Sequence, residues 1–345
     1  MPRKKWPQAR ILGIETSCDE TAAAVVEDGR RALSNVVASQ EKMHAQYGGI
    51  FPEVASREHV RVIDAVVEAA LNDAHLELAD VDAIAVTQGP GLPGSLVVGL
   101  NMAKGLAMGS GKPLYAINHL EGHLYSAWVK LDEGELPDPP EFPLLALIVS
   151  GGHSELVLMK DHLKYERLGG TLDDAAGEAF DKVARLLDLG YPGGPAIQQS
   201  AAAGNPQAFK FPRAWLPDTW DFSFSGLKTA VLHQVRDLER RGGALPIEDL
   251  AASFQASVVD VLVGKTKAAA EQFEVNNVLV AGGVSANQAL RESMQSALDL
   301  PVFLPPMALC TDNAAMIAAA GYFRFARAKP SALDLDVRSN WRLAS

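Results

Sequence analysis

The sequence predicts an α/β protein of two lobes, each built from the same order of elements. Three short apolar strands are expected at the start of each half. They are 11–14, 21–26 and 32–38 in the first half, and 144–149, 155–159 and 164–168 in the second. In both halves a polar turn separates the first two strands, and helices alternate with strands afterwards. The repeated order therefore predicts an internal duplication.

The elements after each set of three strands show helical and strand periodicity in turn. The expected helices are 52–71, 94–108, 173–188, 193–203, 226–241, 247–272 and 312–326, with another beginning near 285 and a short one that carries His119 and His123. The expected further strands are 83–86, 114–117, 278–281 and 302–304. The tail from Lys329 shows little periodicity.

The boundary between the halves is predicted at 132–143, because this stretch contains four prolines and five acidic residues and is typical of a surface linker. We therefore assign 1–131 to an N-terminal lobe and 132–345 to a C-terminal lobe, with the last helix near 312–326 packing at the cleft between them. A duplicated unit of this order resembles the actin-like (ASKHA) architecture of actin, sugar kinases and heat-shock chaperones. In that architecture two turns clamp nucleotide phosphates in an interlobe cleft. A single doubly wound sheet is the alternative.

Length and composition set the broad class. With 345 residues, 48% of them hydrophobic, the chain can bury more than one core. The net charge of −11 disfavours general binding of nucleic acid, so an RNA substrate would need local basic patches or partner proteins. Cys18 and Cys310 show neither metal-finger nor disulfide spacing, which fits a reducing compartment. No apolar run suits a signal peptide or a membrane span, and we expect a cytoplasmic protein without membrane contact.

The first polar turn, 15–20, carries two adjacent carboxylates, Asp19 and Glu20. Backbone N–H and hydroxyl groups at such a turn can hold an anion. Two carboxylates would repel a phosphate unless a cation bridges them or they transfer protons. Asp19 and Glu20 are therefore candidate catalytic groups, and a polar hairpin tip on the surface is the alternative.

The second polar turn and a later glycine pair form the expected nucleotide site. The turn runs from Ile148 to Ser154 and contains Gly151 and Gly152, which let a ligand approach the backbone closely. The later motif, 278–287, is an apolar strand followed by two glycines and a helix start, an arrangement that brings a helix N-terminus against a nucleotide. Asn287 would bind ribose or base there, or would only cap the helix.

A metal site is predicted from His119 and His123. Residues four apart on a helix face the same way, which suits two imidazoles on one ion. Asp312, at a strand-to-helix junction, is the candidate third ligand. Two histidines and one carboxylate leave coordination positions open, as catalytic sites do. Glu121 does not stand where the zinc-protease helix places its glutamate.

Two further regions are less clear. Asp181 would meet ribose or base in a nucleotide site, or would lie on a solvated helix face. The segment 221–229 could contact substrate, or could seat Phe222 and Phe224 in a core.

Taken together, these segments resemble the tRNA N6-adenosine threonylcarbamoyltransferase family (TsaD in bacteria), once described as a glycoprotease. The resemblance covers about 11–326, and the Ser150–His153 turn is similar to that of the bacterial branch. The segments that carry it are 13–21, 119–123, 150–153, 177–182, 222–229, 282–287 and 311–313.

The resemblance implies a function. Enzymes of this family transfer a threonylcarbamoyl group from threonylcarbamoyl-AMP to N6 of the adenosine next to the anticodon, in tRNAs that read codons beginning with A. The products are t6A and AMP. In bacteria such enzymes work with a degenerate paralogue (TsaB-like) and a small P-loop ATPase (TsaE-like).

The resemblance also implies site residues. The metal ligands fall on His119, His123 and Asp312, and the ion is expected to be Fe²⁺, with Zn²⁺ as the other choice. The substrate contacts fall on Ile148, Val149, Ser150, Gly151, Gly152, Asp181, Gly194 and Asn287.

Four rival functions remain open from the sequence. A sugar or acetate kinase of the same fold would bind Mg²⁺ and ATP, but it does not account for the two histidines. A carbamoyltransferase that acts on a small molecule shares both fold and metal use. A metalloprotease conflicts with the position of Glu121, and a non-enzymatic scaffold needs no metal.

Overall fold

The computed structural model describes residues 7–131, 134, 136 and 138–344. Its contacts divide the chain into two compact units. Unit 1 consists of Met1–Pro140 and Pro305–Ser345, and unit 2 of Glu141–Leu304. Four residues of the expected linker, 132, 133, 135 and 137, lie outside the described residues, as do 1–6 at the N-terminus.

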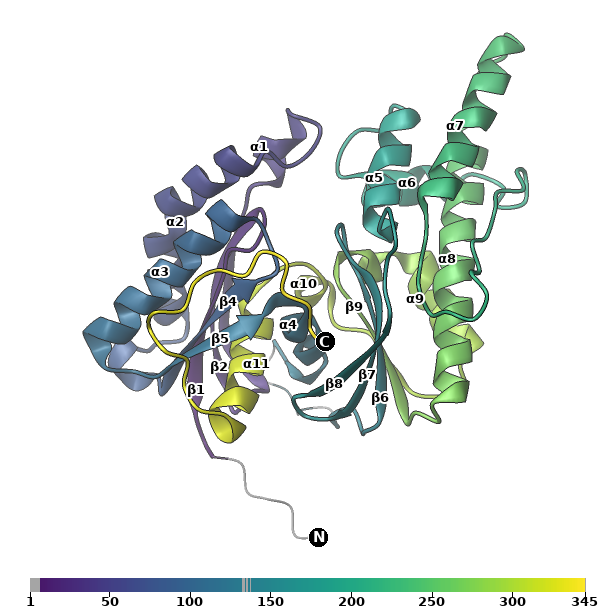
Figure 1. The fold of residues 1–345 in the computed structure, drawn as a ribbon. Helices are drawn as coiled ribbons and strands as arrows, with labels where there is room; N and C mark the ends of the chain where they lie inside the picture. The colour runs from purple at the N-terminus through teal and green to yellow at the C-terminus, as the bar shows by residue number, and fades with distance from the viewer. Residues whose placement is uncertain (1–6, 132–133, 135, 137, 345) are drawn as a thin grey trace. The chain divides into compact units, whose positions relative to one another are not determined.

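Unit 1 contains a five-stranded sheet in the order β3-β2-β1-β4-β5 (Figure 1). Its strands are β1 (Arg10–Glu15), β2 (Glu20–Glu27), β3 (Arg31–Ser39), β4 (Ala83–Gly89) and β5 (Leu114–Asn118). The first three pair antiparallel as a meander, and β4 and β5 add in parallel on the other side of β1. The polar turn between β1 and β2 therefore lies at the same edge as the carboxyl ends of β4 and β5.

Unit 2 repeats this topology. Its sheet has the order β8-β7-β6-β9-β10, again an antiparallel meander followed by parallel strands. Its strands are β6 (Leu144–Val149), β7 (Ser154–Asp161), β8 (Lys164–Gly169), β9 (Asn277–Ala281) and β10 (Val302–Phe303). The predicted duplication is confirmed, and the single doubly wound sheet is excluded.

Helices cover both faces of the unit 1 sheet. On one face α2 (Pro52–Asp73) and α3 (Pro93–Ser110) pack on apolar side chains of β1, β2 and β4. On the other face lie α4 (His119–Tyr125) and α11 (Ala314–Arg327). The strand β1 and the helix α11 are very close, because a Cβ at Gly13 would lie 2.4 Å from the backbone oxygen of Ala314.

The C-terminal segment differs from the lobe division expected from the sequence. We assigned 132–345 to the C-terminal lobe, whereas Pro305–Ser345 belongs to unit 1. The reason is α11, which is apolar on almost every side and is buried along most of its length against β1, β2 and β4. A helix with so much apolar surface needs a sheet face, and unit 1 provides it.

Unit 2 buries its own core. Leu145, Leu147 and Val149 of β6 face a cluster of helices. These are α5 (Ala176–Leu186), α6 (Gly193–Ala201), α7 (Ser225–Arg240), α8 (Ile247–Gln272) and α9 (Gln288–Ala297). The helix expected near 285 begins as a 3-10 turn, η3 (Gly283–Ala286), and becomes α-helical only at Gln288.

Several short elements were not expected from the sequence. They are α1 (Glu41–Ala45), η1 (Leu78–Asp80), η2 (Ser126–Trp128) and α10 (Met307–Cys310). Each has five residues or fewer, too few to show a helical period. Of the helices in the described part of the chain, none is both long enough and apolar enough to cross a membrane.

The tail after α11 is tethered first to the amino-terminal half of β5 and then to the carboxyl ends of β4 and β5. Near its start, Ser331 bonds to the backbone of β5 through Leu114 and Ala116, at 2.7 and 3.0 Å. Further along, the backbone N–H of Arg338 donates to the carbonyl of Gln88 at 2.8 Å. We call residues 331–344 the C-terminal strap.

Candidate metal centre and nucleotide residues

Three side chains of unit 1 form a metal-binding geometry. The ligand atoms of His119, His123 and Asp312 all lie within 4.8 Å of one another. Oδ1 of Asp312 is 3.4 Å from Nε2 of His119 and 3.3 Å from Nε2 of His123. Ligand atoms about 2.1 Å from a tetrahedral ion stand roughly 3.4 Å apart. The three predicted ligands are therefore brought together at the spacing that one ion requires.

The short helix α4 presents both histidines. Asn118 caps it, because its Oδ1 accepts a hydrogen bond from the N–H of Leu120 at 2.9 Å. A Cβ at Gly122 would lie 2.6 Å from Ile317, so α4 packs directly on α11. Glu121 is fully buried, and its carboxylate accepts hydrogen bonds from Nε and Nη2 of Arg324 on α11. Glu121 thus attaches α4 to α11. Because its carboxylate is paired with Arg324, it is not available as the general base of a protease.

His119 is oriented by side chains at the end of β1 and just after it, with support from a side chain of β4. Its Nδ1 lies 3.1 Å from Oε2 of Glu15 and 3.1 Å from Oγ of Ser17. The same carboxylate oxygen accepts from Oγ1 of Thr87 at 2.5 Å. A carboxylate on Nδ1 keeps the proton there and leaves Nε2 free as a ligand, as in carboxylate–histidine–metal arrangements.

His123 provides the test of whether these residues fit a metal. It is fully buried, and neither ring nitrogen makes a hydrogen bond within the described residues. Its Nε2 is close to Asp312 but lacks the alignment of a hydrogen bond. A buried imidazole without partners costs free energy, whereas coordination satisfies Nε2. The site fits a divalent ion held by two imidazoles and one carboxylate.

The charges of the centre are coupled. At His119, burial opposes the charged imidazole, but Asp312 and Glu15 outweigh it and raise the pKa of His119 well above its ordinary value. Burial is the main cause that lowers the pKa of His123. At Asp312, burial opposes the carboxylate, yet the two histidines outweigh it and lower its pKa. The side chain of Asp312 is therefore kept ionised, as a carboxylate, by the positive charge beside it.

The two candidate catalytic carboxylates lie beside this centre. Burial, Asp19 and Asp312 together raise the pKa of Glu20 well above its ordinary value. Burial and the same acidic neighbours raise the pKa of the Cys18 thiol. A carboxylate with a raised pKa can take up a proton near neutral pH.

His59 on α2 fixes the turn that carries these carboxylates. Its Nε2 lies 3.0 Å from the carbonyl of Cys18, and its Nδ1 lies 2.7 Å from Oγ1 of Thr21. Burial lowers the pKa of His59, which keeps the ring neutral, with one donor and one acceptor. His59 could not be singled out from the sequence, because a lone histidine in a helix carries no pattern.

In unit 2 the β6–β7 turn packs against two other segments that the sequence singled out. The N–H of Ser150 donates to the carbonyl of His153 at 2.8 Å, which closes the turn. A Cβ at Gly177 of α5 would lie 2.6 Å from the oxygen of Ser150, and a Cβ at Gly282 would lie 2.4 Å from the oxygen of Val149. The turn, the start of α5 and the β9–η3 junction are therefore in contact.

Four glycines at these places leave open space. A Cβ added at Gly151, Gly152, Gly194 or Gly283 would meet no atom within 4 Å. Ile148 and Val149, in contrast, are fully buried strand residues. Of the predicted contacts, these two can offer a ligand only their backbone.

Asp181 and Asn287 have local hydrogen bonds as well. Oδ1 of Asp181 accepts from the N–H of Gly193 at 2.8 Å, which fixes the turn before Gly194. Oδ1 of Asn287 accepts from Leu290 as the cap of α9, and its Nδ2 donates to Gln255 at 2.8 Å. The cap at Asn287 is confirmed, and its contact with ribose or base stays a prediction.

The segment 221–229 is fixed by residues of its own unit, through core packing and hydrogen bonds. Phe222 and Phe224 are buried, so they are seated in the core. Asp173 accepts hydrogen bonds from the hydroxyls of Ser223 and Ser225, at 2.6 and 2.5 Å. The seating of Phe222 and Phe224 in the core is confirmed, and a substrate contact by this segment stays a prediction.

Fold and site define a class: an actin-like protein with two repeats of one α/β unit and a two-histidine, one-aspartate centre. The family model described as TsaD, tRNA N6-adenosine threonylcarbamoyltransferase, matches residues 31–319. A protein of that name from Thermomicrobium roseum is 55% identical over 97% of each chain. One from Dehalococcoides mccartyi is 54% identical over 95% of this chain and 97% of its own.

A solved structure supports the fold. The crystal structure of HypF from T. kodakarensis aligns with 93% of this chain and 48% of its own, with a TM-score of 0.62 and 16% identity. At that identity the likeness concerns the fold alone. The sequence matches are far stronger, and the chain belongs to the tRNA N6-adenosine threonylcarbamoyltransferase family.

Proposed function

We propose that this enzyme transfers the threonylcarbamoyl group from threonylcarbamoyl-AMP to N6 of the adenosine next to the anticodon, in tRNAs that read codons beginning with A. The observation that carries the proposal is the His119–His123–Asp312 centre in a chain that matches transferases of this name over nearly its whole length.

The reaction requires little from the protein beyond positioning and one proton transfer. A bond forms between N6 and the carbamoyl carbon, the bond from that carbon to the phosphate oxygen breaks, and AMP leaves. The attacking amine loses one proton. Glu20, with its raised pKa and with Asp19 beside it, is suited to accept that proton, and Asp19 to orient it.

His119, His123 and Asp312 would hold one divalent ion, Fe²⁺ in the first place and Zn²⁺ otherwise. Such an ion supplies Lewis-acid polarisation of a carbonyl, or neutralises phosphate charge. Glu15 and Ser17 hold His119 in the orientation that coordination needs. We assign the threonylcarbamoyl end of the substrate to this centre.

The adenylate end is assigned to unit 2. Open backbone at Gly151, Gly152 and Gly194 would let phosphate and ribose approach closely. Ser150 would add a hydroxyl, Ile148 and Val149 their backbone, and Asp181 and Asn287 the contacts to ribose or base.

The proposed partners are tRNA, a degenerate paralogue of the TsaB type and a small P-loop ATPase of the TsaE type, in the cytoplasm. The acidic net charge of the chain, −11, supports the need for partner surfaces in RNA binding.

Metal removal tests the proposal. The chain would be stripped with a chelator, supplied with threonylcarbamoyl-AMP and tRNA, and assayed for t6A by nucleoside mass spectrometry. We expect transfer to fall by at least about 100-fold and to return with Fe²⁺ or Zn²⁺. His123→Ala should not be rescued. Undiminished transfer by the stripped chain would refute the role of the centre, and transfer to a small molecule but not to tRNA would favour a carbamoyltransferase of the other type.

A further inference from the structure

The C-terminal strap is tied to the elements that carry the metal centre. Gln88 donates to the carbonyl of Asp336 at 2.6 Å, and the N–H of Gly91 donates to Ser339 at 3.1 Å. Nδ2 of Asn118 donates to the carbonyl of Trp341 at 3.1 Å. Asn118 caps α4 and immediately precedes His119. The end of the strap is therefore held within one residue of a metal ligand.

These tethers leave the side chains of the strap free for other roles, because most of them use its backbone. A Cβ at Gly89 would lie only 1.9 Å from the oxygen of Arg338, at a φ of +154°. Any other residue at Gly89 would push the strap away. The chain thus places Arg338 and its neighbours against the carboxyl end of β4.

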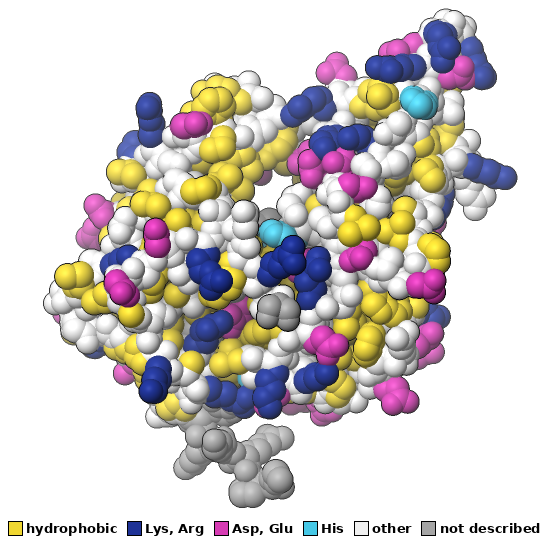
Figure 2. All heavy atoms as spheres, viewed as in Figure 1, with side chains coloured by type: hydrophobic (Ala, Val, Ile, Leu, Met, Phe, Trp, Pro, Cys, Tyr) yellow, Lys and Arg dark blue, Asp and Glu magenta, His cyan; other side chains and the backbone are white. Residues whose placement is uncertain are grey.

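The end of the strap is basic and aromatic. Arg338 and Arg342 are exposed, and neither forms an ion pair within the part of the chain that the structure describes. The guanidinium of Arg338 stacks 4.6 Å from the ring centre of Trp341. The acidic residues of the strap precede this end, and Asp336 accepts from the N–H of Val337 at 2.7 Å. Figure 2 shows Lys and Arg side chains gathered on this face of the molecule.

We infer that Arg338, Trp341 and Arg342 form a docking surface for RNA beside the metal centre. The inference rests on the proposed function, which requires an RNA substrate. Unpaired bases of RNA loops stack on aromatic rings and guanidinium planes, and arginine pairs with phosphate. A stacked Arg–Trp pair with a second free arginine offers both contacts, and the tethers hold them next to His119.

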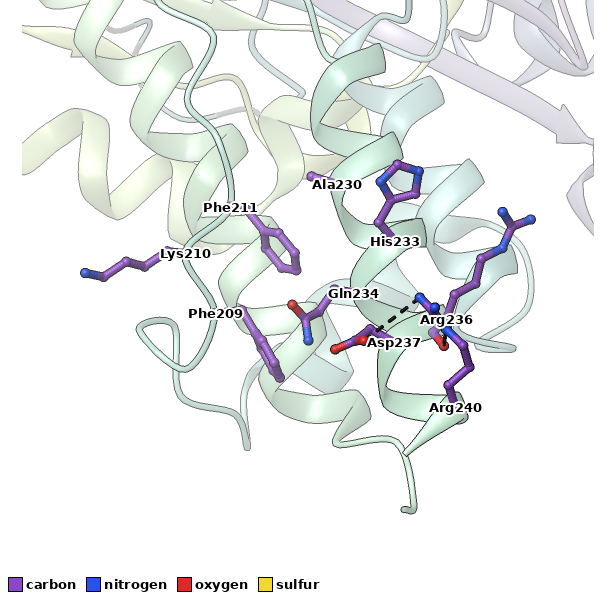
Figure 3. A pocket seen from close by; sticks show the side chains of 9 residues that line it. All are labelled: Phe209, Lys210, Phe211, Ala230, His233, Gln234, Arg236, Asp237 and Arg240. Atoms are coloured by element: carbon purple, nitrogen blue, oxygen red, sulfur yellow. Dashed lines mark hydrogen bonds and ion pairs between the residues drawn. The ribbon is translucent and has the colours of Figure 1, made fainter. Parts of the chain in front are cut away.

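A groove in unit 2 is the rival surface. It has a volume of about 760 Å³ and lies along α7, facing Phe209 and Phe211. In Figure 3, Lys210 and Arg236 point away from each other, and Arg240 turns toward Asp237. Asp237 pairs with Arg240 at 3.9 Å and also with Arg241. The cations of the groove therefore point in different directions and are partly neutralised. For this reason we favour the strap as the RNA-binding surface.

The test is equilibrium binding of the full chain to an unmodified tRNA transcript that reads a codon beginning with A. Fluorescence anisotropy over a salt series gives affinity and salt slope. We expect Arg338→Ala with Arg342→Ala to bind about 10- to 100-fold more weakly, with a slope smaller by about 2. Arg338→Lys with Arg342→Lys should keep the slope and lose affinity by only a few-fold, roughly, because lysine keeps the charge but not the stack.

The matched control is Lys160→Ala with Lys164→Ala, which removes two exposed cations from the β7–β8 hairpin. It should bind as the unaltered chain does. Equal binding by the strap variant, a loss confined to Lys210→Ala with Arg236→Ala, or no binding by the unaltered chain would overturn the inference. Binding requires no adenylate, so a chain that binds tRNA but transfers nothing would refute the proposed function alone.

Discussion

At the scale of single residues, the candidate metal centre depends on groups that would not touch the ion. Glu15 accepts from Thr87, lies 3.1 Å from Nδ1 of His119 and also accepts from the backbone N–H of Ser17. One carboxylate thereby joins β1, β4 and α4. Partners of this kind fix the ring of a ligating histidine and tune its basicity.

Glu15→Gln should weaken metal binding without unfolding the chain. The amide keeps the size of the side chain but removes the charge that supports His119. We expect a loss of about 10- to 100-fold in affinity for Zn²⁺, measured by competition with a chromogenic chelator. Glu27→Gln, on the same sheet and paired with Arg10, is the control. Unchanged affinity for Zn²⁺ in Glu15→Gln would show that the contact between Glu15 and His119 does not contribute to metal binding.

The pH dependence follows from His119. In the metal-free chain burial opposes the imidazolium, but Asp312 and Glu15 raise the pKa of His119 above its unfolded value. The stability from protonated His119 is thus fully present below about pH 6.5 and is lost as pH rises through the folded pKa. A metal needs the neutral ring. The increase in melting temperature on adding Zn²⁺ should therefore grow through that window, and an increase that is flat with pH would contradict the coupling.

At the scale of elements, α4 is too short to position itself. It has seven residues, and its place is set by the Asn118 cap, the contact of Gly122 with α11 and the pair between Glu121 and Arg324. Metal ligands on such a short helix are only as fixed as these three attachments.

Arg324→Ala should destabilise the chain strongly. It leaves the carboxylate of Glu121 buried without its cation, at a cost of about 3 kcal/mol, measured by urea unfolding of the metal-free chain. Glu121→Gln with Arg324→Ala should recover part of that loss, because no charge is left unpaired. If the double variant is no more stable than Arg324→Ala, the pair does not act as described.

Much of the fold could be predicted at this scale, because local patterns carry it. The meanders, the polar turns and the long helices follow from periodicity, and the His119–His123 spacing indicates one ion. The return of Pro305–Ser345 to unit 1 could not be predicted, since only tertiary contacts decide which sheet α11 covers. The strap could not be predicted either. It is held mainly through hydrogen bonds of its backbone, and these leave no periodic pattern of apolar side chains in the sequence. Glu15 and Glu121 look alike in the sequence, and only the structure separates the partner of a ligand from the anchor of a helix.

At the scale of the whole molecule, one α/β topology is used twice with different chemistry. The β1–β2 turn of unit 1 carries carboxylates beside the candidate metal centre, whereas the β6–β7 turn of unit 2 carries glycines with open backbone. We assign the acyl group to the first turn and the adenylate to the second. We also place RNA contacts at the strap, although the chain has a net charge of −11.

The most direct test of this account is the product. The metal-loaded chain, with its proposed partners, would be given threonylcarbamoyl-AMP and a tRNA that reads a codon beginning with A, and the RNA would be digested and analysed by mass spectrometry. We predict t6A at the adenosine next to the anticodon. We predict none when that adenosine is replaced by guanosine or when Asp312→Ala replaces the unaltered chain. An unmodified tRNA, or t6A formed equally well by Asp312→Ala, would contradict it.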